Sequence, residues 1–145
     1  MKTFKIEFKD YGKNNHGIHA EFSLCEYYGI HRTKHDNIAF DKGSDIELGS
    51  KHISVKSARF TLASGSLNEG FTDFDSIWKV YESKVVSNVF VYVDSNGNCY
   101  EMNLEEFKKF VYEFCTVQRD SDDTMKIRAK HESKKMLDYL RNQVI

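Results

Sequence analysis

Proline is missing from this chain of 145 residues, and cysteine, net charge and long apolar runs are all scarce. Average usage would give about seven prolines. This absence, together with abundant lysine, asparagine and aromatic residues, is typical of an AT-rich genome, so we expect a bacterial or phage source. No apolar stretch reaches the length of a membrane span or of a signal-peptide core, which predicts a protein that does not enter a membrane.

The few cysteines, Cys25, Cys99 and Cys115, are odd in number and widely spaced, with no Cys-x-x-Cys pair. This spacing predicts free thiols in a reducing, cytoplasmic environment rather than a disulfide framework. A formal net charge of −1 argues against a basic coat that binds nucleic acid without specificity. The length predicts a single domain over residues 1–145 with one core.

The stretch from Gly43 to Ser57 reads as two short strands joined by a tight turn at Gly49-Ser50. Apolar and polar residues alternate in both halves, which places each apolar pair on one face of a sheet. If the strands pair, the polar face brings together Asp45, Glu47, Ser54 and Lys56. Carboxylates and a lysine on neighbouring strands are the groups that metal-assisted phosphodiester cleavage requires. The same residues are also ordinary on the solvated face of an antiparallel hairpin.

A helix is expected upstream of this hairpin, over residues 19–28, with Gly29 placed to end it and Glu21 one turn from its start. In its order of helix with glutamate, strand with aspartate and strand with lysine, the chain resembles the PD-(D/E)xK nuclease superfamily, which includes many restriction endonucleases and Holliday-junction resolvases. The resemblance implies a restriction-endonuclease-like fold, α/β or α+β, with a mixed β-sheet flanked by helices. Glu21, Asp45 and Lys56 match the catalytic positions of that family.

One departure concerns the acid two residues before the lysine, which is usually Glu in the superfamily and is Ser54 here. Some restriction enzymes of the superfamily carry Ser-x-Lys and recruit a Glu further downstream, and Glu69 lies at a comparable offset. Glu47 is the alternative, because it shares a strand face with Asp45. The offset favours Glu69, but the residues alone do not decide between Glu69 and Glu47. A third possibility is an inactive site without a metal.

The resemblance implies a small Mg²⁺- or Mn²⁺-dependent DNA endonuclease, restriction-like or encoded by a phage. Asp45 would bind the metal together with Glu69 or Glu47 and the Val55 carbonyl. Lys56 would position the attacking water and offset charge on the phosphate.

The same resemblance gives supporting roles to two further residues. Ser54 would support the metal ligands, and Glu21 would hold a metal-bound water or a second ion. Duplex cleavage by so small a chain implies a homodimer with one site for each strand.

Basic residues are concentrated towards the C-terminus, where Lys126, Arg128 and Lys130 alternate along an expected strand. Such a row suits the phosphate backbone of DNA, and Arg59 is a further candidate for contact with nucleic acid. Because Glu132 follows closely, an ordinary solvated surface is the alternative.

The remaining pattern predicts short strands and helices around one core. Asp73 or Asp75 caps one helix, and Asn103 with Glu106 forms a capping box at the start of another. Residues 63–70 are small and polar and are expected to form a mobile loop. Strands are expected at 3–8, 53–62, 85–93, 99–102 and 125–130, and helices at 75–82, 103–114 and 133–144.

Three other functions compete with the nuclease. A nuclease fold without catalysis would bind nucleic acid or a host or phage defence protein, with Ser54 recording the loss of the metal site. An unrelated α+β protein-interaction domain would carry residues 45–56 as plain surface. A zinc site is the weaker interpretation, because no second cysteine lies near its candidate ligands His16, His19, Cys25, His31 and His35.

Overall fold

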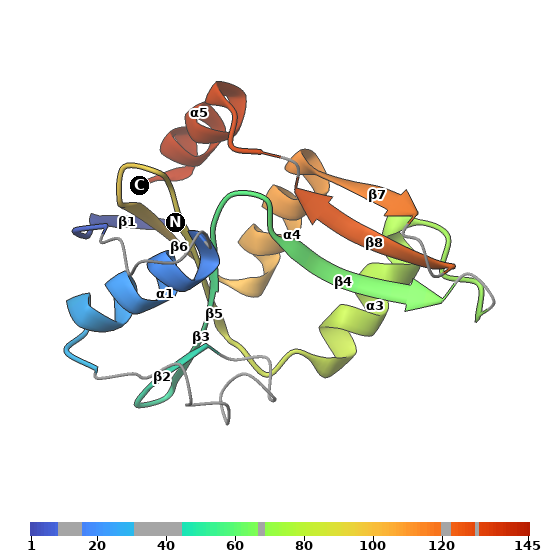
Figure 1. Cartoon of the computed structure of the whole chain (residues 1–145), viewed down its shortest axis with the longest axis horizontal. Coiled ribbons are helices and arrows are strands. Elements are labelled where there is room, and N and C mark those ends of the chain that lie inside the picture. Colours follow the sequence, from blue (N-terminus) through green and yellow to red (C-terminus); the bar gives the residue numbers. More distant parts are fainter. Residues whose placement is uncertain (9–15, 31–44, 67–68, 120–122, 130) are drawn as a thin grey trace.

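A mixed sheet of five strands, in the order β1-β6-β5-β3-β2, forms the larger part of the protein (Figure 1). The computed structural model describes residues 1–8, 16–30, 45–66, 69–119, 123–129 and 131–145. β3 and β5 run parallel, whereas the other neighbouring pairs are antiparallel. The strands are β1 (Lys2–Lys5), β2 (Ile46–Leu48), β3 (Lys51–Lys56), β5 (Val89–Val93) and β6 (Asn98–Met102).

A second, antiparallel sheet of three strands has the order β4-β8-β7. Its strands are β4 (Thr61–Ser66), β7 (Cys115–Arg119) and β8 (Thr124–Ala129). The expected single strand at 53–62 is therefore wrong. β3 ends at Lys56, and the chain passes through Arg59, whose φ of 65° is left-handed, before β4 begins in the other sheet.

Two further expectations about strands are corrected by this arrangement. The expected mobile loop at 63–70 is wrong at its start, because residues 63–66 pair with β8 and this backbone pairing overrides their small, polar composition. The strand expected over 85–93 begins only at Val89, since the preceding residues connect it to a helix. β7, which follows a helix directly, was not expected at all.

Helix α1 (His16–Tyr27) lies on one face of the main sheet and begins before the residue expected from the sequence. It ends as predicted, because Gly29 adopts a φ of 72°. The Gly29 amide donates to the Glu26 carbonyl at 3.1 Å and the Ile30 amide to the Cys25 carbonyl at 2.8 Å, which is a Schellman motif. The apolar cluster beneath the helix contains Ala20, Leu24, Ile53, Val91, Val93 and Cys99.

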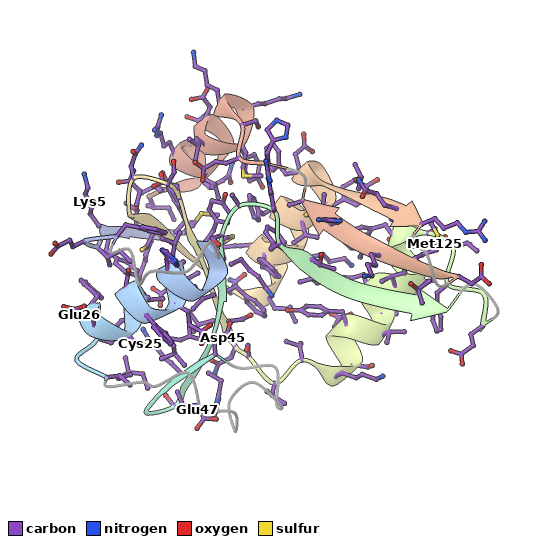
Figure 2. All side chains as sticks on the ribbon, viewed as in Figure 1. Lys5, Cys25, Glu26, Asp45, Glu47 and Met125 are labelled. Carbon is purple, nitrogen blue, oxygen red and sulfur yellow. The ribbon has the colours of Figure 1, made fainter. Side chains whose placement is uncertain are left out.

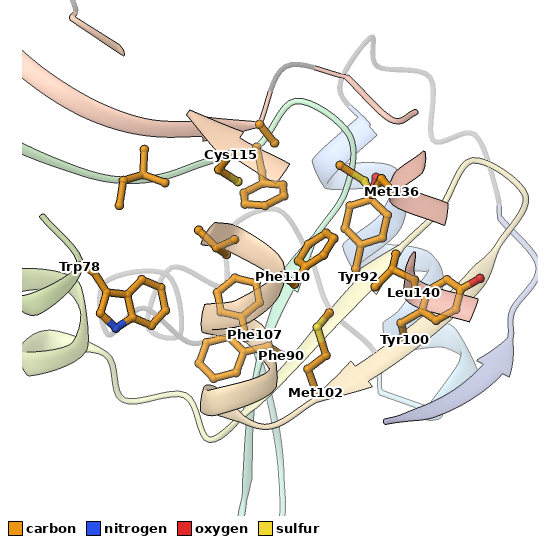
Figure 3. Packing of buried hydrophobic residues seen from close by; sticks show 14 of the residues in the cluster. Trp78, Phe90, Tyr92, Tyr100, Met102, Phe107, Phe110, Cys115, Met136 and Leu140 are labelled. Carbon is orange, nitrogen blue, oxygen red and sulfur yellow. The ribbon is translucent and has the colours of Figure 1, made fainter. Parts of the chain in front are cut away.

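The opposite face of the main sheet and the inner face of the second sheet enclose an aromatic core (Figure 3). Three helices contribute to it: α3 (Phe74–Lys84), α4 (Leu104–Phe114) and α5 (Lys134–Gln143). The rings of Phe90 and Phe107 stack at its centre with centroids 4.4 Å apart. Because the side chains of β5 alternate, Phe90 and Tyr92 enter this core while Val91 and Val93 face α1.

The predicted starts of the three helices after α1 agree with the structure. The Asp73 side chain caps α3, Asn103 and Glu106 form a capping box on α4, and the Ser133 side chain caps α5. The mixed α/β class and the single compact domain are likewise confirmed. None of the helices within the described ranges is long and apolar enough to cross a membrane.

Candidate active site at the edge of the main sheet

The hairpin expected to carry the site is present. β2 and β3 pair antiparallel with Ile46 opposite Ile53, and Gly49 turns the chain between them with a φ of 62°. Ile46 and Ile53 are both buried against the α1 side, as the alternation predicts. Because β2 begins only at Ile46, opposite Ile53, β3 itself forms the edge of the sheet over its last residues.

Asp45 takes the place that a further residue of β2 would occupy at this edge. Its amide donates to the Ile53 carbonyl at 2.8 Å, and its Oδ2 accepts a hydrogen bond from the Val55 amide at 2.7 Å. The carboxylate is therefore fixed beside the end of β3, as Figure 2 shows. A carboxylate held by a backbone amide has a defined position without needing a neighbouring cation.

Lys56 ends β3 next to this carboxylate and is half-buried. Burial lowers the pKa of Lys56 below its ordinary value, because the charged form loses solvation. The negative charges of Asp45 and Glu21 act in the opposite direction and raise that pKa. Asp45 and Glu21 are therefore close enough for their charges to act on the Lys56 amine.

Glu21 reaches this cluster from α1. It lies in the first half of the helix and is only 8% exposed, which is uncommon for a glutamate. α1 packs on β3, so its buried face carries Glu21 towards the sheet.

Two neighbours of the cluster were not predicted. The charge of Asp45 adds to burial in raising the pKa of Tyr81, which belongs to α3. Burial raises the pKa of Cys115, at the start of β7, to about 12, and the charge of Lys56 partly opposes this shift. Both residues come from elements distant in the sequence, and no local motif marks either of them.

The other acids proposed for a metal site lie elsewhere. Glu47 is exposed on the hairpin, and its Oε1 lies 3.5 Å from Nδ1 of His52. Glu69 is exposed and follows β4, whose Gly65 pairs with Met125 far from Asp45 in Figure 2. The structure therefore does not bring Glu69 next to Asp45.

Ser54 is buried on β3, one strand position after Ile53. Within the described part of the chain, no group of three or more histidine, cysteine, aspartate or glutamate side chains is arranged to hold a metal ion. Of the proposed zinc ligands, Cys25 is buried, and His31 and His35 lie outside the described residues. The side chain of His16 also lies outside them.

The expected basic surface is present in part. Along β8, Lys126 and Arg128 alternate with the buried Ile127 and Ala129, so they lie on the outer face of the second sheet. Lys130 lies outside the described residues. Arg59 comes near the end of β8, because the Ala129 amide donates to the carbonyl of Phe60 at 2.9 Å.

All three cysteines are buried and free of disulfides, as their spacing predicts. Comparison of the chain with models of protein families, with curated proteins and with solved structures finds no match. What can be inferred about function therefore depends on the residues and on the geometry described above.

Proposed function

We propose that the protein is a Mg²⁺- or Mn²⁺-dependent endonuclease that hydrolyses phosphodiester bonds of DNA, of the PD-(D/E)xK kind. The observation that carries the proposal is the half-buried Lys56, which ends a strand between the charges of Asp45 and Glu21. The order of these residues on helix, hairpin and strand is the one that the superfamily resemblance requires.

The donors around Asp45 fit a hard divalent cation. Mg²⁺ in proteins is commonly held by one or two carboxylates and keeps several water molecules. The Val55 amide donates towards Asp45, and a strand residue directs its carbonyl to the same side as its amide. Asp45, Glu21 and the Val55 carbonyl would thus hold the ion, which would polarise the phosphate and lower the pKa of a bound water.

Lys56 has two uses in such a site. Because burial lowers its pKa, more of the neutral amine is present near neutral pH, and this form can accept the proton that the attacking water loses. The protonated form offsets negative charge that develops on the phosphate oxygens as the bond to the leaving sugar oxygen breaks. Ser54, buried on the same strand, would hold the strand end that carries the lysine in place.

Binding of the substrate would use the basic residues outside this cluster. Arg59, Lys126 and Arg128 would contact phosphates of the backbone, and Lys130 belongs to the same proposal on its sequence position alone. Two copies of the chain would be needed to cut both strands of a duplex.

The test is a plasmid-nicking assay with purified protein. Supercoiled DNA should become nicked or linear with Mg²⁺ or Mn²⁺ and stay intact with EDTA. A labelled single-stranded RNA in the same buffers establishes whether cleavage is limited to DNA. Intact plasmid under every metal condition, with folded protein, would contradict the proposal.

A second function is favoured by one specific observation. Ser54 replaces the usual acid, and Glu69, its expected substitute, does not lie near Asp45. The loss of this acid is expected in a catalytically inactive protein of this fold, which would bind nucleic acid or a protein of a defence system. Such a protein would bind DNA in EDTA and cleave none with metal.

A further inference from the structure

A cavity lies just beyond the carboxyl ends of the parallel strands β3 and β5. Its lining includes Ser57 to Arg59, which follow β3, and Val93 to Ser95, which end and follow β5. The cavity volume is about 340 Å³, which falls in the range of small-molecule sites. In open α/β sheets, ligands bind preferentially outside the carboxyl ends of parallel strands.

The apolar part of the cavity lining, the Phe8 floor, consists of Phe8, Ala58 and Val93. The amide of Ile6 donates to the carbonyl of Gly97 at 2.9 Å, which ties the segment leading to Phe8 onto the β5–β6 turn. A flat, apolar group would therefore find a fixed surface here.

The two acids of the cavity already have internal donors. Asp94 is fully buried and accepts from the Asn96 amide, the Asn98 amide and the Asn98 side chain, each at 2.9 Å. Glu132 accepts from the Tyr92 hydroxyl at 2.9 Å and from the Ser95 hydroxyl at 2.7 Å. These carboxylates shape the site, and their hydrogen bonds leave them poorly suited to a new cation.

The basic groups of the cavity are in the opposite situation. Arg59 and His131 line it, are exposed, and form no ion pair with any other residue in the described ranges. The φ of 65° at Arg59 is a conformation that glycine adopts without strain and arginine does not. An arginine held in this conformation in the lining of a cavity points to a use for that side chain.

We infer that this cavity binds a single nucleotide unit, with the base on the Phe8 floor and the phosphate on Arg59 and His131. The guanidinium offers paired donors that match phosphate oxygens, and an imidazole adds another donor. Phosphate alone would leave the apolar floor uncovered, and a nucleoside alone would leave both basic groups without a partner. The inference rests on the cavity and holds whether or not the Asp45–Lys56 cluster cuts DNA.

Calorimetric titration in EDTA tests this site directly. The probes are dAMP, dTMP, deoxyadenosine, inorganic phosphate and a short single-stranded DNA. A nucleotide or the strand should bind at least about tenfold more tightly than phosphate or the nucleoside alone. Tighter binding of the mononucleotide identifies a free nucleotide as ligand, and tighter binding of the strand identifies a nucleotide within a chain.

Variants separate the cavity from general charge effects. Arg59→Gln and Arg59→Gly should each weaken binding about tenfold. Glycine adopts the left-handed φ at this position without strain, so the Arg59→Gly variant should fold. A loss of binding in this variant would therefore reflect the missing guanidinium. Lys79→Gln removes the same charge from an exposed position on α3, outside the cavity, and should bind as the unchanged protein does.

Absence of saturable binding by nucleotide and strand alike, or unchanged affinity in both Arg59 variants, would overturn the inference. Asp45→Asn keeps the two proposals apart, because it should retain nucleotide binding. Binding without any cleavage contradicts only the nuclease, and cleavage without nucleotide binding contradicts only the cavity.

Discussion

Two groups of charged residues lie at the carboxyl end of β3, and they are arranged in opposite ways. In the Asp45–Lys56 cluster, the lysine is half-buried and two carboxylates oppose the effect of its burial. In the Arg59 cavity, the carboxylates bind internal donors and the basic groups are exposed. In the cluster, the positive and negative groups act on one another. In the cavity, the basic groups are left to bind a ligand.

The two groups also differ in how the chain fixes them. Asp45 accepts a hydrogen bond from the Val55 amide at a sheet edge, next to a short hairpin. The cavity is supported by the β5–β6 turn, where the Gly97 amide donates to the Asp94 carbonyl at 3.1 Å and the Gly97 carbonyl accepts from the Ile6 amide at 2.9 Å. We therefore expect damage to the turn to cost far more stability than comparable damage to the hairpin.

Alanine in place of glycine at these two turns tests that difference and carries the largest expected effect. At Gly97 the φ is 85°, and an added Cβ would lie 2.3 Å from the Ile6 carbonyl oxygen. At Gly49 the φ is 62°, but no atom lies within 4 Å of the added Cβ. Gly97→Ala should lower the free energy of unfolding by about 2–4 kcal/mol, and Gly49→Ala by about 1 kcal/mol. Chemical denaturation measures both, and equal losses would contradict the account of the turn.

Metal affinity distinguishes the acids of the cluster from the acid outside it. Asp45→Asn and Glu21→Gln should each weaken Mn²⁺ binding by about tenfold or more, because each removes a carboxylate near the ion. Glu69→Gln should bind as the unchanged protein does, since Glu69 follows the distant β4. Calorimetry on the three variants measures this. Weakened binding in Glu69→Gln alone would restore the displaced-acid arrangement expected from the sequence.

The pH dependence of stability probes the burial of Lys56. Because the pKa of Lys56 is lowered in the folded protein, the unfolded chain binds more protons between that pKa and the ordinary value of 10.5. Stability contributed by this residue therefore rises with pH across that window. Denaturation of the unchanged protein and of Lys56→Met gives the difference in their free energies of unfolding at neutral pH and at about pH 10. Relative to Lys56→Met, the unchanged protein should be more stable at the higher pH than at the lower. If the difference in free energy of unfolding between the two proteins did not change with pH, Lys56 would be solvated in the folded protein.

Local patterns in the sequence predicted much of this structure, because local physics decides those features. The Gly29 helix end, the Asp73 and Asn103 caps and the β2–β3 hairpin all depend on residues within one or two turns. The second sheet could not be predicted in the same way. Alternation continues across Ser57 to Leu62, and only tertiary pairing with β8 decides that the chain leaves the main sheet there.

The candidate site shows the same division. Asp45 and Lys56 share a hairpin, so their proximity follows from strand parity, and Glu21 follows from the superfamily resemblance. Tyr81 and Cys115 could not be found from the sequence, because α3 and β7 approach the cluster only in the folded chain. The position of Glu69 depends on the same change of sheet after Lys56.

Cleavage by two lysine variants of β3 tests the central claim most directly. Lys56→Met removes the lysine of the cluster, whereas Lys51→Met removes one at the other end of the strand, where Nζ lies 3.2 Å from Glu101 on the surface. Such a surface pair contributes little to stability, so Lys51→Met should fold. With Mg²⁺ we predict that the nicking rate of Lys56→Met falls by about hundredfold or more while Lys51→Met cuts at the unchanged rate. Cleavage by Lys56→Met at the rate of the unchanged protein would contradict the assignment of this cluster as the active site.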